Sequence, residues 1–147
     1  MAAQTRTPAG TDWTTRLRTA GLRVTQPRLA VLDVVSSTPH ISADAVTDRV
    51  RDRLGTVSVQ AVYDALNTLT KHDILRKFEP AGSSMRFEVH TGDNHHHLIC
   101  RRCGDIIDVA CSVGAMPCAL PDDPHGFVVD EAEVTYWGVC SSCRTYG

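Results

Sequence analysis

Histidine and cysteine crowd one short stretch of the chain. Three consecutive histidines at 95–97 lead through two apolar residues to Cys100 and Cys103, a Cys-x-x-Cys pair followed by glycine. A second such pair, Cys140 and Cys143, stands near the C-terminus. Imidazole and thiolate are the side chains that bind borderline-soft divalent metals best. The pattern therefore indicates a metal-binding protein.

The two cysteine pairs can complete one tetrahedral zinc site. Each pair forms a knuckle that presents two thiolates to an ion, and four thiolates leave no open coordination position. The 36 residues between the pairs require a small folded sheet there. We therefore predict structural zinc bound by Cys100, Cys103, Cys140 and Cys143. The alternatives are two unrelated pairs or a redox dithiol, but no βαβ pattern surrounds either pair.

The three consecutive histidines and the two cysteines outside the Cys-x-x-Cys pairs do not belong to the predicted zinc site. His95 and His97 are two residues apart on a predicted strand, so they share one face while His96 points the other way. Cys111 and Cys118 are left over, seven residues apart. They are read either as buried small apolar residues or as a redox-responsive pair, and the first interpretation is favoured.

Four helices and a hairpin are expected ahead of the metal-binding stretch. Each helix follows a residue that can cap its N-terminus, namely Asp12, Thr25, Ser42 and Ser58. Residues 74–79 and 84–89 read as strands around a Pro-Ala-Gly-Ser turn. This is the layout of a winged helix-turn-helix, in which the helix after the tight turn enters the major groove.

Beyond the hairpin, strands are expected at 97–99, 105–109 and 127–137, and the span 111–120 is a poor helix because glycine and proline interrupt it. The predicted fold class is α+β, with a winged-helix domain followed by a small α/β domain. The predicted boundaries are a disordered leader at 1–10, a DNA-binding domain at 11–90, a linker at 91–94 and a metal-binding domain at 95–147.

Composition and charge narrow the function. No apolar run approaches the length of a membrane span, and the leader lacks a signal-peptide core, which predicts a cytoplasmic protein with reduced thiols. Residues 1–80 carry eleven basic and eight acidic side chains, whereas 81–147 carry four and nine. The basic excess of residues 1–80 therefore favours binding to the phosphates of nucleic acid.

A zinc hydrolase is a remote alternative because no His-Glu-x-x-His or deaminase pattern occurs. We predict that the protein is not an enzyme.

Several motifs in a consistent order resemble the ferric uptake regulator family. They are Gly21-Leu-Arg-Val-Thr25-x-x-Arg28, His40 before a capped helix, Ser58-x-x-x-Val62-Tyr63, His95-x-His97-x-x-Cys100-x-x-Cys103-Gly104 and Cys140-x-x-Cys143. The histidine run after Asp93 and the stretch 126–138 look most like the actinobacterial branch that controls catalase-peroxidase genes.

The resemblance implies that the protein is a homodimeric, metal-activated repressor that binds palindromic, A·T-rich operator DNA. It implies the four-cysteine structural zinc and a regulatory site for Fe(II) or Mn(II), with Ni(II) or Zn(II) also compatible. The regulatory positions fall on His40, Glu88, His95, His97 and Asp108. Many members have a further site, whose last histidine is replaced here by Ala132; His96 with Glu131 or Glu133 would make a weaker version.

The resemblance also suggests what is sensed. In peroxide-sensing relatives, oxidation of a ligand histidine beside bound Fe(II) releases the metal and the operator. Asp108 favours a peroxide response, because iron sensors commonly have glutamate there. A nickel- or zinc-responsive repressor and a thiol-redox repressor are the alternatives.

DNA contacts are predicted on the winged-helix domain. Gln60 and Tyr63 on the helix after Ser58 are expected to meet base edges and thymine methyl groups. The resemblance places Arg23 at a narrow A·T-rich minor groove. Phosphate contacts are predicted for Arg16, Arg28, Arg76 and Lys77. For each arginine the alternative is a solvated surface charge.

Overall fold

The computed structural model describes residues 12–92, 95–111 and 117–145. They form two compact units, which we call the N-terminal unit (to Thr91) and the C-terminal unit (from Gly92). Each unit has its own three-stranded sheet, and the first also holds four helices. The predicted α+β class is confirmed. The predicted leader and residues 93–94 of the predicted linker lie outside the described residues.

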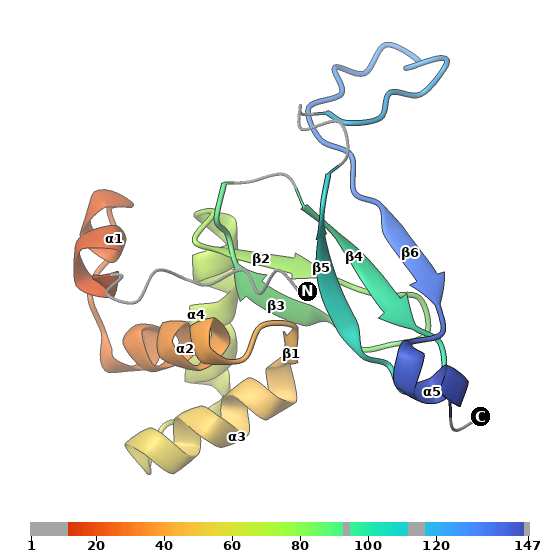
Figure 1. Cartoon of the computed structure of the whole chain (residues 1–147). Helices are drawn as coiled ribbons and strands as arrows, with labels where there is room; N and C mark the ends of the chain where they lie inside the picture. Colours follow the sequence, from red (N-terminus) through yellow and green to blue (C-terminus); the bar gives the residue numbers. More distant parts are fainter. Residues whose placement is uncertain (1–11, 93–94, 112–116, 146–147) are drawn as a thin grey trace. The chain divides into compact units, whose positions relative to one another are not determined.

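Four capped helices build most of the N-terminal unit (Figure 1). They are α1 (Trp13–Thr19), α2 (Gln26–Ser37), α3 (Ala43–Leu54) and α4 (Val59–Lys71). The side chain before each helix accepts a backbone N–H of its first turn, and the four caps are the predicted Asp12, Thr25, Ser42 and Ser58. Helix α3 stops at Gly55, whose φ of 78° lies in the left-handed region that favours glycine.

The predicted hairpin is confirmed and gains a third strand. Strands β2 (Leu75–Phe78) and β3 (Arg86–Val89) pair antiparallel. The short β1 (Ile41–Ser42) pairs with the other edge of β3, through Ile41 opposite Phe87. Two residues are too few to show an alternating pattern, so the sequence did not predict β1. Its pairing is what holds the chain before α3 against the sheet.

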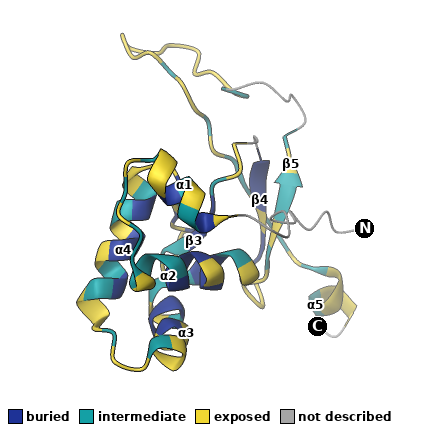
Figure 2. Cartoon of the chain, turned by 90° about the vertical axis from the view of Figure 1, so that its left-hand side faces the viewer, coloured by how far each residue is buried: buried dark blue, intermediate teal, exposed yellow. Residues whose placement is uncertain are grey.

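An apolar core fills the N-terminal unit. Figure 2 shows buried residues on the inward faces of its helices and exposed residues outside. The side chains without exposed surface include Leu17, Leu32, Val35, Val50 and Leu69. On α4 the buried face consists of Val62, Ala65, Leu66 and Leu69, as expected from helical spacing. The opposite face of α4 is therefore available to a partner.

Truncating this core tests how far the unit is stabilised by packing. Leu69→Ala should destabilise the N-terminal unit by about 2–5 kcal/mol, because it leaves a cavity among closely packed side chains. Chemical denaturation followed by circular dichroism measures the loss. Bound zinc per chain should not change, since the four cysteines lie in the other unit.

The C-terminal unit is a mixed sheet closed by a short helix. Its elements are β4 (His95–Cys100), β5 (Ile106–Ala110), β6 (Thr135–Gly138) and α5 (Ser141–Thr145). Strand β4 is central, antiparallel to β5 and parallel to β6. The parallel pair places Cys100 opposite Gly138, two residues before Cys140. This register brings the two cysteine pairs to the same end of the sheet.

The predicted strand at 127–137 is wrong for most of its length, because only Thr135–Gly138 is a strand. His125 and Gly126 adopt positive φ, which turns the chain just before the predicted start. Phe127 and Val128 are 78% and 94% exposed, so their apolar character does not reflect burial in a sheet. Residues 117–134 extend away from the sheet (Figure 1).

Candidate metal centres and nucleic-acid interface

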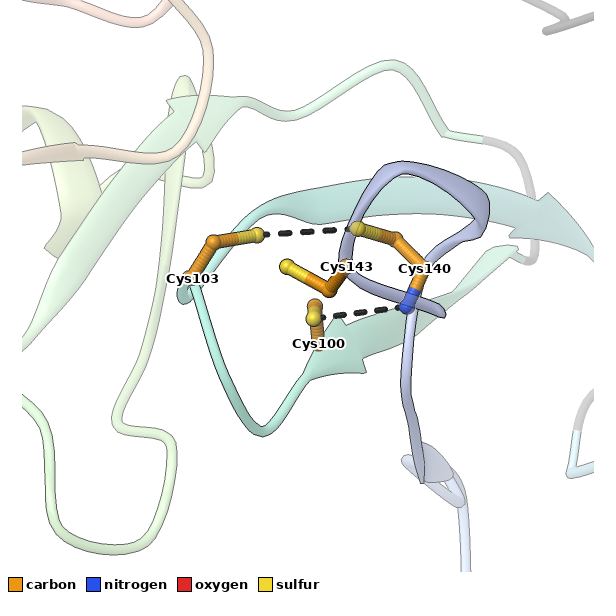
Figure 3. A group of neighbouring side chains, drawn as sticks. All are labelled: Cys100, Cys103, Cys140 and Cys143. Atoms are coloured by element: carbon orange, nitrogen blue, oxygen red, sulfur yellow. Dashed lines mark hydrogen bonds between the residues drawn. The ribbon is translucent and has the colours of Figure 1, made fainter. Parts of the chain in front are cut away.

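The four predicted zinc ligands come together at the end of β4 (Figure 3). Cys100 ends β4, Cys103 lies in the following turn, and Cys140 and Cys143 flank the start of α5. All four sulfur atoms lie within 4.8 Å of one another. Cys103 Sγ and Cys140 Sγ are 3.7 Å apart, and tetrahedral zinc with bonds of about 2.3 Å needs sulfurs about 3.8 Å apart. The donor set and its spacing fit zinc.

Backbone groups prepare the cysteines for a cation. The backbone N–H groups of Cys103 and Cys140 lower the pKa of Cys100 to about 6. The backbone nitrogen of Cys140 lies 3.3 Å from the Cys100 sulfur. The sulfurs of Cys140 and Cys103 raise the pKa of Cys143 to about 12. These backbone groups therefore favour the thiolate form of Cys100, and the crowding of sulfurs that opposes ionisation of Cys143 is what a dication would neutralise.

A nitrogen and oxygen ligand set forms on β4 and β5. His95 and His97 share one face of β4, as predicted, with ring centroids 5.4 Å apart. His97 pairs in register with Asp108 on β5. Asp108 Oδ1 lies 3.5 Å from His97 Nε2 and 3.8 Å from His95 Nε2. Three predicted ligands thus converge within the C-terminal unit, and their N/O chemistry suits Fe(II), Mn(II), Ni(II) or Zn(II).

Glu133 lies on the other side of the His97 ring, with Oε1 3.9 Å from Nδ1. The sequence suggested Glu133 only as a weak partner for His96. This separation is longer than a hydrogen bond, so Glu133 is a carboxylate neighbour of the ring in this structure. Its position depends on where the non-strand segment before β6 runs, which the sequence did not show.

A histidine and a glutamate lie close together in the N-terminal unit. His40 Nε2 lies 3.3 Å from Glu88 Oε2, because β1 and β3 pair directly beside them. His40 has a φ of 63°, a conformation that non-glycine residues rarely adopt and that concentrates at functional sites. Its ring packs edge-on against Phe78, with centroids 5.9 Å apart. The backbone strain is thus held by the sheet and by this packing.

The predicted base-reading residues lie on α4. Gln60 is exposed and donates from Nε2 to Asp64 Oδ1 at 2.8 Å. Tyr63 donates its hydroxyl proton to Asp44 Oδ1 at 3.0 Å, and this hydrogen bond raises the pKa of Tyr63. Both side chains are therefore oriented by carboxylates before any ligand arrives.

The predicted phosphate-binding residues differ in their surroundings. Arg23, in the loop before α2, and Lys77, on β2, are exposed, whereas Arg76 is half-buried. Arg16 donates to the His90 carbonyl oxygen at 2.6 Å, and burial lowers its pKa. Arg28 donates to the Arg23 carbonyl oxygen at 2.7 Å and so braces the loop. Arg16 and Arg28 thus make hydrogen bonds to backbone carbonyl groups within the unit. Their contacts with phosphates stay predictions.

Comparison with known proteins identifies the family. The model of the Ferric uptake regulator family matches residues 19–116. The chain belongs to the ferric uptake regulator family. It is 52% identical to the transcriptional regulator FurA of Mycobacterium tuberculosis over 132 residues, covering 90% of each chain. It is 30% identical to the peroxide-responsive repressor PerR of Staphylococcus epidermidis, covering 89% of this chain and 87% of that protein.

Solved structures share the fold of the family. The ferric uptake regulator of Helicobacter pylori superposes with a TM-score of 0.66 at 23% identity, covering 88% of this chain and 87% of that one. A zinc uptake regulator in complex with zinc and DNA gives 0.65 at 24% identity, covering 90% of each. The expected fold is confirmed, and the chain is a metal-responsive transcriptional regulator of this family. Among the described residues, no helix has the length and apolarity to cross a membrane.

Proposed function

We propose that the protein is a homodimeric, cytoplasmic repressor that binds A·T-rich palindromic operator DNA when one metal ion joins its two units. The ligands are His40 and Glu88 of the N-terminal unit with His95, His97 and Asp108 of the C-terminal unit. The observation that carries the proposal is that each unit already holds part of this set, with His40 Nε2 3.3 Å from Glu88 and both other histidines against Asp108.

Neither part saturates a metal ion by itself. Two donors from one unit and three from the other leave positions open on ions that take four to six ligands. A shared ion therefore fixes one unit relative to the other. In a dimer, that sets the spacing of two recognition helices, which must match a major-groove repeat of about 34 Å. Operator affinity then depends on metal occupancy through this linkage.

The recognition surface we propose is the outer face of α4, with Gln60 and Tyr63 toward base edges and the exposed Arg23 and Lys77 toward the grooves and phosphates. Support comes from the exposure of Gln60, Arg23 and Lys77 and the partial exposure of Tyr63. The zinc uptake regulator that was solved with DNA adds to it.

Homodimerisation is supported by apolar side chains that the C-terminal unit leaves uncovered. Leu120, Phe127 and Val128 are 70%, 78% and 94% exposed, and Tyr136 on β6 is 48% exposed. Apolar surface of this kind marks interaction sites. A second copy of the chain is the partner that a palindromic operator requires.

We further propose that the regulatory ion is iron or manganese and that peroxide is the signal, with oxidative-stress genes such as catalase-peroxidase as targets. Support comes from the similarity to PerR and from Asp108 in place of glutamate. Bound Fe(II) would supply the reduction of peroxide. The chain supplies His95 and His97, whose ring centroids lie 5.4 Å apart, as oxidisable ligands. Nickel or zinc sensing and a thiol-redox response remain the alternatives.

The test is binding of the full-length protein to a promoter fragment of a catalase-peroxidase gene. Fe(II), Mn(II), Ni(II) and Zn(II) are added in turn, each with and without peroxide. Fe(II) and Mn(II) should both increase affinity, and only the Fe(II) complex should release DNA after peroxide. Release that occurs equally with Mn(II) would point to a thiol response, and unchanged affinity with every metal would refute the switch.

Base readout by α4 makes a separate prediction. Gln60→Ala should reduce discrimination between operator and unrelated DNA by about 1–3 kcal/mol, because an amide side chain pairs with adenine at two points. Competition binding with both DNA fragments measures this difference. Affinity for the unrelated fragment should stay the same, and a uniform loss on both fragments would instead assign Gln60 to backbone binding.

A further inference from the structure

The C-terminal unit contains a third group of metal-binding atoms, outside both sites described above. His96, Cys111 and Cys118 each offer a ligand atom within 4.8 Å of the others. His96 is buried and the two cysteines are half-buried. The zinc-site cysteines and the regulatory ligands do not share any member with this group.

Sheet register explains why these residues meet. His96 faces away from His95 and His97 on β4, since side chains alternate along a strand. It pairs in register with Val109 of β5, and Cys111 follows two residues later, where alternation returns the chain to the same face. Cys118 then reaches the same place from the extended segment before β6, with Sγ 3.2 Å from His96 Nε2.

We propose that His96, Cys111 and Cys118 bind a thiophilic dication, zinc in the first instance, with the fourth position open to water. Two thiolates and an imidazole select soft and borderline metals, unlike the N/O regulatory set. The nitrogen–sulfur distance of 3.2 Å is within about 0.4 Å of the value of about 3.6 Å for a tetrahedral zinc site. Binding releases the two thiol protons to solvent.

The site differs from the additional site that many family members share. The histidine that completes that site is Ala132 here, and its carbonyl oxygen lies 4.0 Å from Cys118 Sγ. Thiols therefore occupy the space near a position where an imidazole would otherwise stand. The inference does not depend on operator binding, because it rests only on contacts within the C-terminal unit.

Metal binding here would act on the neighbouring backbone. The Val134 N–H donates to His96 Nδ1 at 3.2 Å, so the neutral ring carries its proton on Nε2, facing Cys118. Coordination through Nε2 would leave the ring proton on Nδ1, which would end the hydrogen bond from Val134. It would also replace the Nε2 contact with Cys118. Two hydrogen bonds of His96 would thus be exchanged for three metal–ligand bonds. The Val134 carbonyl accepts from the His97 N–H at 3.3 Å, which connects the site to a regulatory ligand.

The test counts metal on the full-length protein, kept reduced, loaded with zinc and separated from free metal. Cys118→Ser and His96→Ala should each lose one zinc ion per chain relative to the wild type. His125→Ala, which changes an exposed histidine of the same unit, should lose none. Cobalt substitution gives a second readout, since sulfur-to-cobalt charge-transfer absorption should fall in Cys118→Ser by more than the His125→Ala control.

Alkylation of the wild-type protein avoids any doubt about variant folding. Zinc should slow the modification of Cys111 and Cys118 by about tenfold or more, because a coordinated thiolate is a poor nucleophile in solution. A selective chelator should restore the rate. Equal zinc content in wild type and Cys118→Ser, or modification rates that zinc does not change, would overturn the proposal and leave a hydrogen-bonded or redox-active thiol pair.

Discussion

Cys103→Ser is expected to abolish zinc binding at the four-cysteine site and to unfold the C-terminal unit, while the N-terminal unit remains folded. Among the described residues, the apolar core cluster consists of residues up to Val89, and only Ile99 and Cys100 are buried apolar residues of the C-terminal unit. A structural zinc site contributes about 10–16 kcal/mol, against a net stability of about 5–15 kcal/mol for a whole domain.

Two measurements check this outcome. Zinc content per chain should fall by one ion, and thermal unfolding should show only the transition of the N-terminal unit. Ser142→Ala is the matched control, because Ser142 is an exposed residue of α5 and lies between Cys140 and Cys143 in the sequence. A Cys103→Ser protein that keeps its zinc and melts like the control would show that the sulfurs do not hold the unit together.

His97→Ala should make operator affinity independent of the regulatory metal. His97 is a buried ligand candidate, since β4 fixes its backbone, Asp108 lies 3.5 Å from Nε2 and Glu133 lies 3.9 Å from Nδ1. Its loss removes a metal bond and takes one imidazole away from Asp108, which keeps only His95 of the two β4 histidines. The metal-dependent gain in affinity, about 5- to 150-fold for typical coupling energies, should disappear.

Titration of operator fragment binding against Mn(II) measures this effect without oxidation of the metal. His72→Ala removes an exposed histidine at the end of α4 and should preserve the full response. The structural zinc should stay in place in both variants. A normal Mn(II) response in His97→Ala would remove the β4 histidines from the regulatory site.

Local features of the fold could be predicted from the sequence. The caps Asp12, Thr25, Ser42 and Ser58 act through hydrogen bonds within one helical turn, so sequence spacing is enough to find them. The facing of His95 and His97 follows from strand alternation alone. The prediction of zinc ligands depended on paired motifs, and their sulfur geometry fits that assignment.

Features that depend on long-range pairing could not be predicted. Strand β1 exists because Ile41 meets Phe87, and this pairing holds His40 beside Glu88. The position of Glu133 depends on the segment predicted as a strand at 127–137, where Phe127 and Val128 are instead exposed. Cys118 lies before that segment, in the span predicted to be a poor helix. The contact of Cys118 with His96 gave no signal in the sequence, because a lone cysteine has no periodicity to read.

The central claim is that His40 of one unit and His97 of the other bind the same regulatory ion. A double-mutant cycle tests it directly, with Mn(II)-dependent operator affinity measured for His40→Ala, His97→Ala and the double variant. If the ion is shared, each single variant loses the metal response and the double variant loses no more. Additive losses, or a full response in His40→Ala, would show that the two histidines do not share an ion.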